Sequence, residues 1–270
     1  MRVITLTSDL GTKDYYVAAV KGALYRQVPD IQIVDISHHI GAFDTRQAAY
    51  ILRGCWQEFP KGTIHIIGVN SELTADTRHV IIEHKEHFFI GGDDGLYSLL
   101  FDHVPDNKFE LNVTQDTDDS TFPVKNLFVK AAAHLARGGT PEVIGKRIES
   151  LKDLSNFRAV VEESVIKGSV IHIDVYGNVI TNISRALFKE VGKGRDFAIM
   201  FRKASLDIRK IHNQYSDVPD GMGVALFTHS GFLEIAINKG APGSGGGANS
   251  LFGLKINDIV RIEFNANQNR

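Results

Sequence analysis

The stretch that decides the fold is "VITLTSDLGTKDYYVAAVKGALYRQVPDIQIVDIS", residues 3–37. A β-rich run opens it, an apolar pattern of helical period follows, and a second β-rich run ends it. A strand, a helix and a strand in this order are typical of a parallel sheet with helices packed on its faces. We therefore expect the chain to begin with an α/β domain.

The same alternation continues beyond residue 37. The next runs indicate in turn a helix, a strand, a strand pair and a last helix: "TRQAAYILRGCWQEF" (45–59), "GTIHIIGV" (62–69), "HVIIEH" and "HFFIGG" (79–92), and "NLFVKAAAHLARGG" (126–139). We expect Ser120 and Thr121 to form the polar entry of the last helix and Gly139 to end it. These elements predict a mainly parallel sheet in an α/β domain, residues 1–160.

The pattern changes to short strands near residue 165. The strand runs are "SVIHIDVYGNVITNIS" (169–184), "DFAIMF" (196–201), "GVALFTHSGFLEIAIN" (223–238) and "DIVRIEF" (258–264). They favour a small antiparallel barrel or sandwich, and we assign residues 161–270 to a β-barrel domain. The polar segment 148–164 between the two patterns is expected to be an irregular linker.

Composition indicates an ordinary globular protein. The chain has 270 residues, 43% of them hydrophobic, and a formal net charge of -2. There is no basic excess, so we expect neither nucleic acid nor an anionic membrane as a partner. No run approaches the roughly 20 apolar residues of a membrane span, and the first residues read as a strand. The single cysteine, Cys55, excludes an internal disulfide, and its apolar neighbours favour an inert thiol. We expect a cytoplasmic location.

Three features invite a functional interpretation. Asp9 follows the first strand, where ligands bind in open parallel sheets, so it could accept ribose hydroxyls or simply cap a helix. The histidines lack metal-ligand spacing, so no metal site is expected. The glycine-rich segment 240–250 lacks the Gly-Lys-Ser/Thr ending of a phosphate loop. It is therefore expected to be a flexible surface or subunit-contact loop, with a ligand clamp as the alternative.

Several segments in order resemble one family, the S-adenosylmethionine hydroxide adenosyltransferases, relatives of fluorinating and chlorinating enzymes. The segments include "TLTSDLGTKDYYVAAVKG", "IVDISHHI", "FIGGDDGL", "IDVYGNVITNIS" and "YSDVPDGMGVALFTHSGFLEIAIN". The resemblance implies an N-terminal α/β domain, a C-terminal β-barrel and a homotrimer with sites between subunits. It also implies attack of water or halide on the ribose 5′ carbon of S-adenosylmethionine, which expels methionine. S-adenosylmethionine is the substrate, and no cofactor is implied.

Seven residues match substrate-holding positions of that family: Asp9, Asp14, Phe122, Asp174, Asn178, Ser230 and Asn238. The resemblance implies that Asp9 accepts the ribose hydroxyls and that Asp14 lies near the methionine end. It places Asp174 against the methionine ammonium and Ser230 against its carboxylate. Asn178 and Asn238 then lie near the nucleoside, and Phe122 lines the reaction pocket. Asn178 follows a glycine, so it could instead be a turn residue.

The chemical positions depart from the family pattern. Hydrolytic members show "VDPGVG" followed by arginine, and this chain has "GVNSELTADTR" at residues 68–78. Asn70 stands at the aspartate position, and Arg78 matches the arginine. We take these two as the catalytic candidates, with Glu72 as a further acid. Three alternatives follow: a hydrolase that aligns water, an adenosine-binding protein without turnover, or an enzyme with a different nucleophile.

Pro123 stands where the family has its water-activating histidine, and Val124 replaces a small residue that contacts halide in fluorinating relatives. Proline has no polar side chain and no backbone N–H. His134 has apolar neighbours at helical spacing and is expected to pack its helix. We therefore expect water to be aligned without an imidazole base, unless His38 or His39, the nearest candidates by loop position, supplies one.

Overall fold

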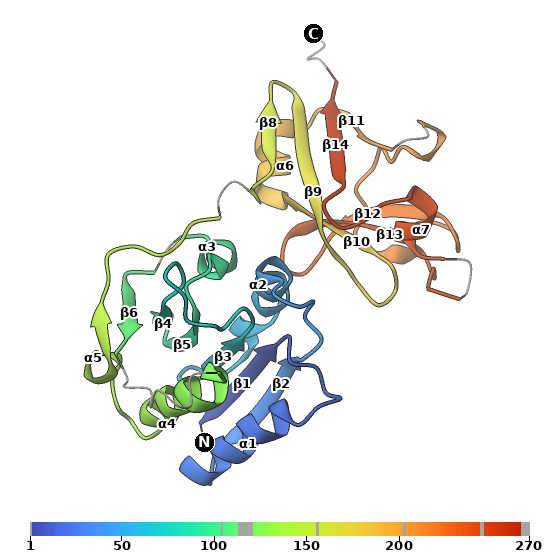
Figure 1. Cartoon of the computed structure of the whole chain (residues 1–270). Helices are drawn as coiled ribbons and strands as arrows, with labels where there is room; N and C mark the ends of the chain where they lie inside the picture. Colours follow the sequence, from blue (N-terminus) through green and yellow to red (C-terminus); the bar gives the residue numbers. More distant parts are fainter. Residues whose placement is uncertain are drawn as a thin grey trace. The chain divides into compact units, whose positions relative to one another are not determined.

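The computed structural model describes residues 2–103, 105–112, 121–154, 157–201, 204–243 and 246–265. The chain divides into two compact units, Met1–Ser155 and Asn156–Arg270 (Figure 1). Ser120, the expected helix entry, lies outside the described residues. In the part of the chain that is described, no helix has both the length and the apolar character needed to cross a membrane.

The first unit is built on a seven-stranded mixed sheet of order β2-β1-β3-β5-β4-β6-β7. Four neighbouring strands are parallel: β2 (Gln32–Ser37), β1 (Val3–Ser8), β3 (Ile64–Gly68) and β5 (His87–Gly92). Three antiparallel strands extend it: β4 (His79–His84), β6 (Asn107–Leu111) and β7 (Gly145–Arg147). The prediction of a mainly parallel sheet in an α/β domain is confirmed.

Helices cover both faces of this sheet (Figure 1). One face packs against α1 (Tyr16–Gln27), a π-helical turn η3 (Val124–Phe128) and α4 (Val129–Ala136). The other face packs against α2 (Thr45–Arg53), η1 (Trp56–Glu58) and α3 (Leu96–Leu100). The short α5 (Pro141–Ile144) precedes β7. Because both faces are covered, every residue of β1 and β3 is buried, which explains their continuous runs of β-rich sequence.

The strand order places a topological switch point at β1. The chain runs from β1 to β2 on one side and then crosses to β3 on the other. In open α/β sheets, ligands bind in the crevice at the carboxyl ends of the strands on either side of such a point. Gly68 ends β3 there, and a side chain at this position would lie 3.0 Å from a methyl carbon of Val124. Glycine therefore lets the start of η3 lie against the end of β3.

The second unit is an antiparallel sheet of order β11-β14-β9-β10-β13-β12, with β8 paired to β9. Its strands are β8 (Val160–Glu162), β9 (Val165–Ile173), β10 (Val179–Ser184), β11 (Phe197–Met200), β12 (Gly223–Phe227), β13 (Phe232–Ile237) and β14 (Ile259–Phe264). The helical pieces are α6 (Arg185–Gly192), η5 (Ala204–Leu206), η6 (Tyr215–Asp217) and α7 (Ala248–Phe252). The segment 148–164 is not wholly irregular as predicted, because β8 lies within it.

The sheet of the second unit curls on itself. Ile208 forms an antiparallel bridge with Ile199 of the edge strand β11, and Ile211 forms a parallel bridge with Ala225 of the other edge strand, β12. The short segment between these two bridges therefore joins the two edges of the sheet. Apolar side chains of the strands, such as Val260 and Ile235, fill the inside. The prediction of an antiparallel barrel-like sheet is confirmed, as a curled half-barrel.

Candidate functional site

The candidate residues of the first unit gather at one edge of its sheet. Asp9 follows β1, and Asn70 lies two residues beyond β3. Arg78 precedes β4, whose first residue, His79, pairs with Gly92 at the end of β5. Because β4 runs antiparallel to β5, its start lies at the carboxyl edge of the parallel strands. The three residues therefore share the edge where the topology predicts a ligand crevice.

Asp9 anchors a loop and does not cap the helix that follows. Its Oδ2 accepts a hydrogen bond from the backbone N–H of Phe43 at 2.9 Å. The N-cap of α1 is Tyr15, which makes no side-chain cap hydrogen bond. The helix-cap interpretation of Asp9 is therefore wrong. A carboxylate has two acceptor oxygens, so a half-buried Asp9 retains acceptor capacity for a ligand hydroxyl.

Aromatic side chains stand beside this carboxylate along the sequence. The Tyr16 ring meets Phe122 edge to face, with centroids 5.4 Å apart, and lies 4.6 Å from the Tyr15 ring. Tyr15 and Phe43 are 69% and 73% exposed, which leaves apolar rings open to a planar ligand. The pKa of Tyr16 is raised, mainly by Tyr15 and to a smaller extent by the charge of Asp14. Asp14 and Phe122 are thus both neighbours of Tyr16.

Asn70 and Arg78 each engage a different carboxylate. Asn70 adopts a positive φ of 47°, and its Nδ2 donates to Oδ2 of Asp94 at 3.3 Å. Arg78 donates from Nε to Oδ2 of Asp93 at 3.0 Å and also reaches the carbonyl of Ser150. The aspartate-arginine pair of this edge is therefore Asp93–Arg78. Both aspartates follow the buried strand β5 in "GGDDGL", a signal that the sequence interpretation missed.

Asp94 is a buried acid with several donors. Its side chain accepts from the Thr45 hydroxyl and from the Leu96 backbone at 3.2 Å, besides Asn70. Burial raises its pKa, although these hydrogen bonds act in the opposite direction. Glu72, the further acid considered from the sequence, lies on the exposed part of the same loop. His79 fixes the base of that loop through Nε2, 2.8 Å from the carbonyl of Ser71.

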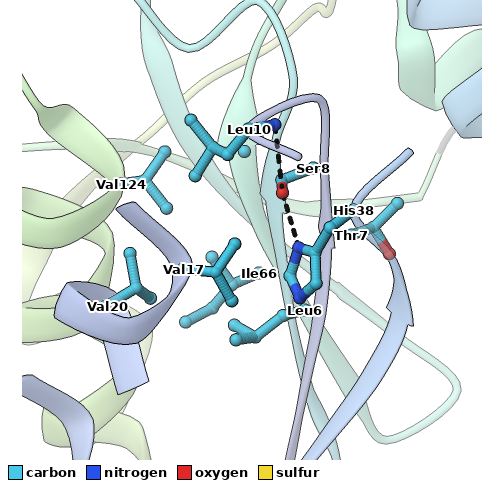
Figure 2. A pocket seen from close by; sticks show the side chains of 10 residues that line it. Leu6, Thr7, Ser8, Leu10, Val17, Val20, His38, Ile66 and Val124 are labelled. Atoms are coloured by element: carbon cyan, nitrogen blue, oxygen red, sulfur yellow. Dashed lines mark hydrogen bonds between the residues drawn. The ribbon is translucent and has the colours of Figure 1, made fainter. Parts of the chain in front are cut away.

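A small pocket lies between Val124, at the start of η3, and the strands β1 and β3 (Figure 2). Its apolar lining includes Val17, Ile66 and Val124, and its polar lining includes Ser8 and His38. The cavity volume is about 10 Å³, on the order of the space one water molecule needs. Pro123, directly before Val124 in the chain, is the N-cap of η3 and is buried. The position that the family resemblance assigns to a histidine therefore supplies no imidazole here.

The second unit holds Asp174 and Asn178 in one tight turn between β9 and β10. Oδ1 of Asp174 accepts from the backbone N–H of Tyr176 and of Asn178, both at 2.9 Å, and Oδ2 accepts from Nδ2 of Asn178 at 3.0 Å. Gly177, with a φ of 77°, completes the turn. Asn178 is thus a turn residue in this structure, and any role in binding is additional to that one.

The glycine-rich segment packs on this turn. A side chain at Gly247 would lie 2.5 Å from the carbonyl oxygen of Tyr176, and the backbone N–H of Asn249 donates to the carbonyl of Gly177 at 2.9 Å. The C-terminal end of the segment is therefore not a free loop, because it contacts this turn and continues into α7, which begins at Ala248. Ser244 and Gly245 lie outside the described residues.

Asn238 and Ser230 lie at opposite ends of β13. Asn238 is buried, and its Nδ2 donates to the carbonyl of Val218 at 2.7 Å, which holds the loop before β12. The Ser230 hydroxyl lies 3.0 Å from that of Thr228. A six-residue strand spans about 20 Å, so the structure does not bring Ser230 to Asn238.

A buried glutamate in β13 was missed from the sequence. Glu234 is 5% exposed, and its Oε1 accepts from the Tyr215 hydroxyl at 2.8 Å. Burial raises its pKa, and the charge of nearby Asp174 adds to this effect. The signal in the sequence is its place within the apolar run "FLEIAI".

Comparison with known proteins places this architecture. Models of the SAM hydroxide adenosyltransferase N-terminal and C-terminal domains match residues 4–145 and 168–261. The chain belongs to the SAM hydroxide adenosyltransferase family. It is 30% identical to an (R)-S-adenosyl-L-methionine hydrolase of Thermus thermophilus, over 97% of this chain and 100% of that protein. It is 26% identical to a fluorinase of Nocardia brasiliensis, over 87% of this chain and 90% of that protein.

Two solved structures share the fold over nearly their whole length. A conserved protein of Thermotoga maritima superposes with a TM-score of 0.82 at 26% identity, over 96% of this chain and 99% of that one. A conserved protein of Thermus thermophilus gives a TM-score of 0.74 at 28% identity, over 98% of this chain and 100% of that one. The two-unit fold is therefore shared with these proteins over nearly the whole chain.

Proposed function

We propose that this family member hydrolyses S-adenosyl-L-methionine to adenosine and L-methionine by attack of water on the ribose 5′ carbon. The observation that carries the proposal is the Asp9 carboxylate at the switch point, next to exposed aromatic rings. A bidentate acceptor beside planar apolar surface suits a ribose and its base. The relatives named as S-adenosyl-L-methionine hydrolases support the substrate.

The substrate determines what the protein has to supply. The sulfonium is already a good leaving group, so the proposed reaction needs no cofactor and no acid at the sulfur. The protein has to hold the ribose, direct water in line with the departing sulfur and exclude other water. Asp9 and Phe122 are proposed to hold the nucleoside, and Asp14 and Asp174 to face the methionine end. Arg78, fixed by Asp93, supplies a positive charge at the same sheet edge.

We further propose a homotrimer in the cytoplasm, with each site formed between adjacent subunits. The support is the division of the candidates between the two units: Asp9, Asp14 and Phe122 lie in the first, and Asp174, Asn178, Ser230 and Asn238 in the second. Closed rings of identical subunits place different surfaces of neighbours in contact.

The second candidate is an adenosine-binding protein without turnover. Asn70 and Pro123 favour it, because neither can carry the ionised or basic group of the family pattern. The purified protein should be incubated with S-adenosyl-L-methionine while adenosine and methionine are followed by chromatography, and adenosine binding should be measured by calorimetry. Multiple turnovers are expected. Adenosine binding without product would replace the hydrolase proposal with the binding protein, and a different adenosyl product would indicate another nucleophile.

A further inference from the structure

Ser8, His38 and Asp35 form a chain of polar contacts at the carboxyl ends of β1 and β2. The Ser8 hydroxyl lies 2.7 Å from Nδ1 of His38 (Figure 2). On the other side of the ring, Nε2 of His38 lies 3.1 Å from Oδ1 of Asp35. Ser8 is 3% exposed and His38 is 5% exposed, so both are shielded from bulk water. A hydroxyl, an imidazole and a carboxylate in this order can move a proton.

The charges around the ring favour transfer from Ser8 toward His38. Asp35 is held ionised: burial alone would raise its pKa, but the hydrogen bond from Lys21 and the neighbouring His38 ring lower it. Lys21 lies 2.5 Å from the other oxygen of Asp35. Nε2 of His38 is within ion-pair distance of this carboxylate but makes no hydrogen bond of good geometry among the described residues. With the ring proton on Nε2, Nδ1 is an acceptor for the Ser8 hydroxyl. A proton taken up at Nδ1 would then give an imidazolium beside a carboxylate.

The chain ends at the small pocket beside Val124. Ser8 and His38 line this pocket together with Val124 and Gly68. Ser8 is also the residue before Asp9, the proposed ribose ligand. A water in the pocket would therefore lie beside the Ser8 hydroxyl, one residue before the proposed ribose ligand. This is also the region where proline stands at position 123, which the family resemblance assigns to a histidine.

We propose that Ser8 and His38 form a proton relay that activates the attacking water in this chain. The proposal rests on the hydrolase function proposed above. The water oxygen bonds to the 5′ carbon while the carbon–sulfur bond breaks and its electron pair stays on the sulfur of methionine. The water proton passes to Ser8 Oγ as the Ser8 proton passes to Nδ1 of His38. The imidazolium, paired with Asp35, then releases its proton to solvent.

The competing explanation is structural, because a buried histidine bonded to a serine also stabilises a fold. The two explanations differ in what they predict for kcat and KM. A structural pair changes folding and binding together when it is broken. A relay changes the chemical step while substrate affinity is retained.

The test compares Ser8→Ala and His38→Asn with His39→Asn, a control at the exposed neighbouring histidine. We expect kcat for S-adenosyl-L-methionine to fall about 100- to 10,000-fold in Ser8→Ala and His38→Asn, the usual worth of general-base help. KM and adenosine affinity should stay within about threefold, since binding groups are untouched. His39→Asn should behave as wild type.

The outcomes separate the two proposals. Wild-type turnover with kcat unchanged in Ser8→Ala overturns the relay and leaves the hydrolase. A wild type that binds adenosine and gives no product overturns the hydrolase and the relay with it. If His38→Asn fails to fold, Ser8→Ala decides, because removing one hydroxyl keeps the strand residue small. A fall in affinity equal to the fall in kcat/KM assigns the pair to structure and also overturns the relay.

Discussion

Asn70, which the family resemblance places at an aspartate position, makes contacts that limit which side chain can stand there. Its amide donates to a buried carboxylate whose pKa is already raised. An aspartate at position 70 would place a second carboxylate about where the amide now lies, 3.3 Å from Asp94. Asn70 thus donates to Asp94 without adding a second negative charge, and in this sense the two side chains form a matched pair.

We expect Asn70→Asp to lower the free energy of unfolding at pH 7.5 by about 1–3 kcal/mol, the usual cost of a lost donor to a buried acceptor. The loss should shrink as the pH is lowered, because burial raises the pKa of Asp94 and its protonation removes the repulsion. Urea denaturation at pH 7.5 and at a series of lower pH values measures it. Asn70→Gly is the control, since it keeps the positive φ and loses only the hydrogen bond. An Asn70→Asp protein as stable as wild type at pH 7.5 would show that the pair is not matched.

The proposal that the nucleoside binds at the sheet edge of the first unit rests on a single residue, Asp9. Asp9→Ala should weaken adenosine binding by about 1.5–3 kcal/mol, the range for hydrogen bonds to a charged group. Calorimetry measures the change, and circular dichroism checks that the loop held through Phe43 has not unfolded. Asp30→Ala, an exposed aspartate at the end of the α1–β2 connection, is the control. Equal affinities in wild type and Asp9→Ala would remove Asp9 from the site.

At the scale of elements, strand β3 carries a buried histidine. The His65 ring is fully buried, with Nδ1 2.8 Å from the Thr5 hydroxyl and Nε2 3.2 Å from the His87 ring. It stacks on Phe89 with centroids 4.7 Å apart. Burial, with a smaller contribution from the charge of His87, lowers the pKa of His65 to about 3. The ring is therefore neutral in the folded protein throughout the neutral and mildly acidic range.

This strand predicts acid sensitivity. The unfolded chain binds a proton at His65 near pH 6.5 and the folded chain only near pH 3, so stability is complete above pH 6.5 and falls as the pH drops toward 3. At pH 5 the loss from His65 is about 2 kcal/mol, at 1.36 kcal/mol per pH unit. His65→Gln keeps a hydrogen-bonding group near Thr5 but does not titrate. Urea titrations should show that the free energy of unfolding falls less between pH 7.5 and pH 5 in this variant than in wild type. An equal fall in both proteins would contradict the assignment.

Elements also show how far the sequence could lead. The strand and helix periods were enough to predict both domains and to place Asp9 at a strand end. They could not show that β4 runs antiparallel to β5, which brings Arg78 to Asp93. Nor could they show that His38 lies against Ser8, because 30 residues separate the two in the chain. Hydrophobic periodicity depends on local sequence, whereas contacts between distant side chains depend on the order and register of the strands.

At the scale of the whole molecule, the candidates for one ligand divide between two units. Asp9 belongs to the α/β unit, and Asp174 belongs to the β unit, where its two oxygens already hold a turn. Ser230 and Asn238 lie at the two ends of one strand, and Asn238 is buried, so the candidates of the β unit are spread along β13 and do not gather in one place.

The proposed two-subunit site can be tested by mixing variants. Asp9→Asn and Asp174→Asn keep the shape and most acceptors of each side chain but remove the charge, so each alone should lose most of its activity at low substrate concentration. If each site takes Asp9 from one subunit and Asp174 from its neighbour, co-expressed variants should form trimers in which about a quarter of the sites carry both native residues. Differently tagged, co-purified hybrids exclude the trimers of a single variant, and each mixed trimer carries one native site among its three, so their activity should recover to about a third of wild type. Each variant mixed with itself is the control. Sites that lie within one subunit would recover no activity, because every chain carries one of the two substitutions. A monomer by light scattering that still turns over substrate would equally contradict the shared site.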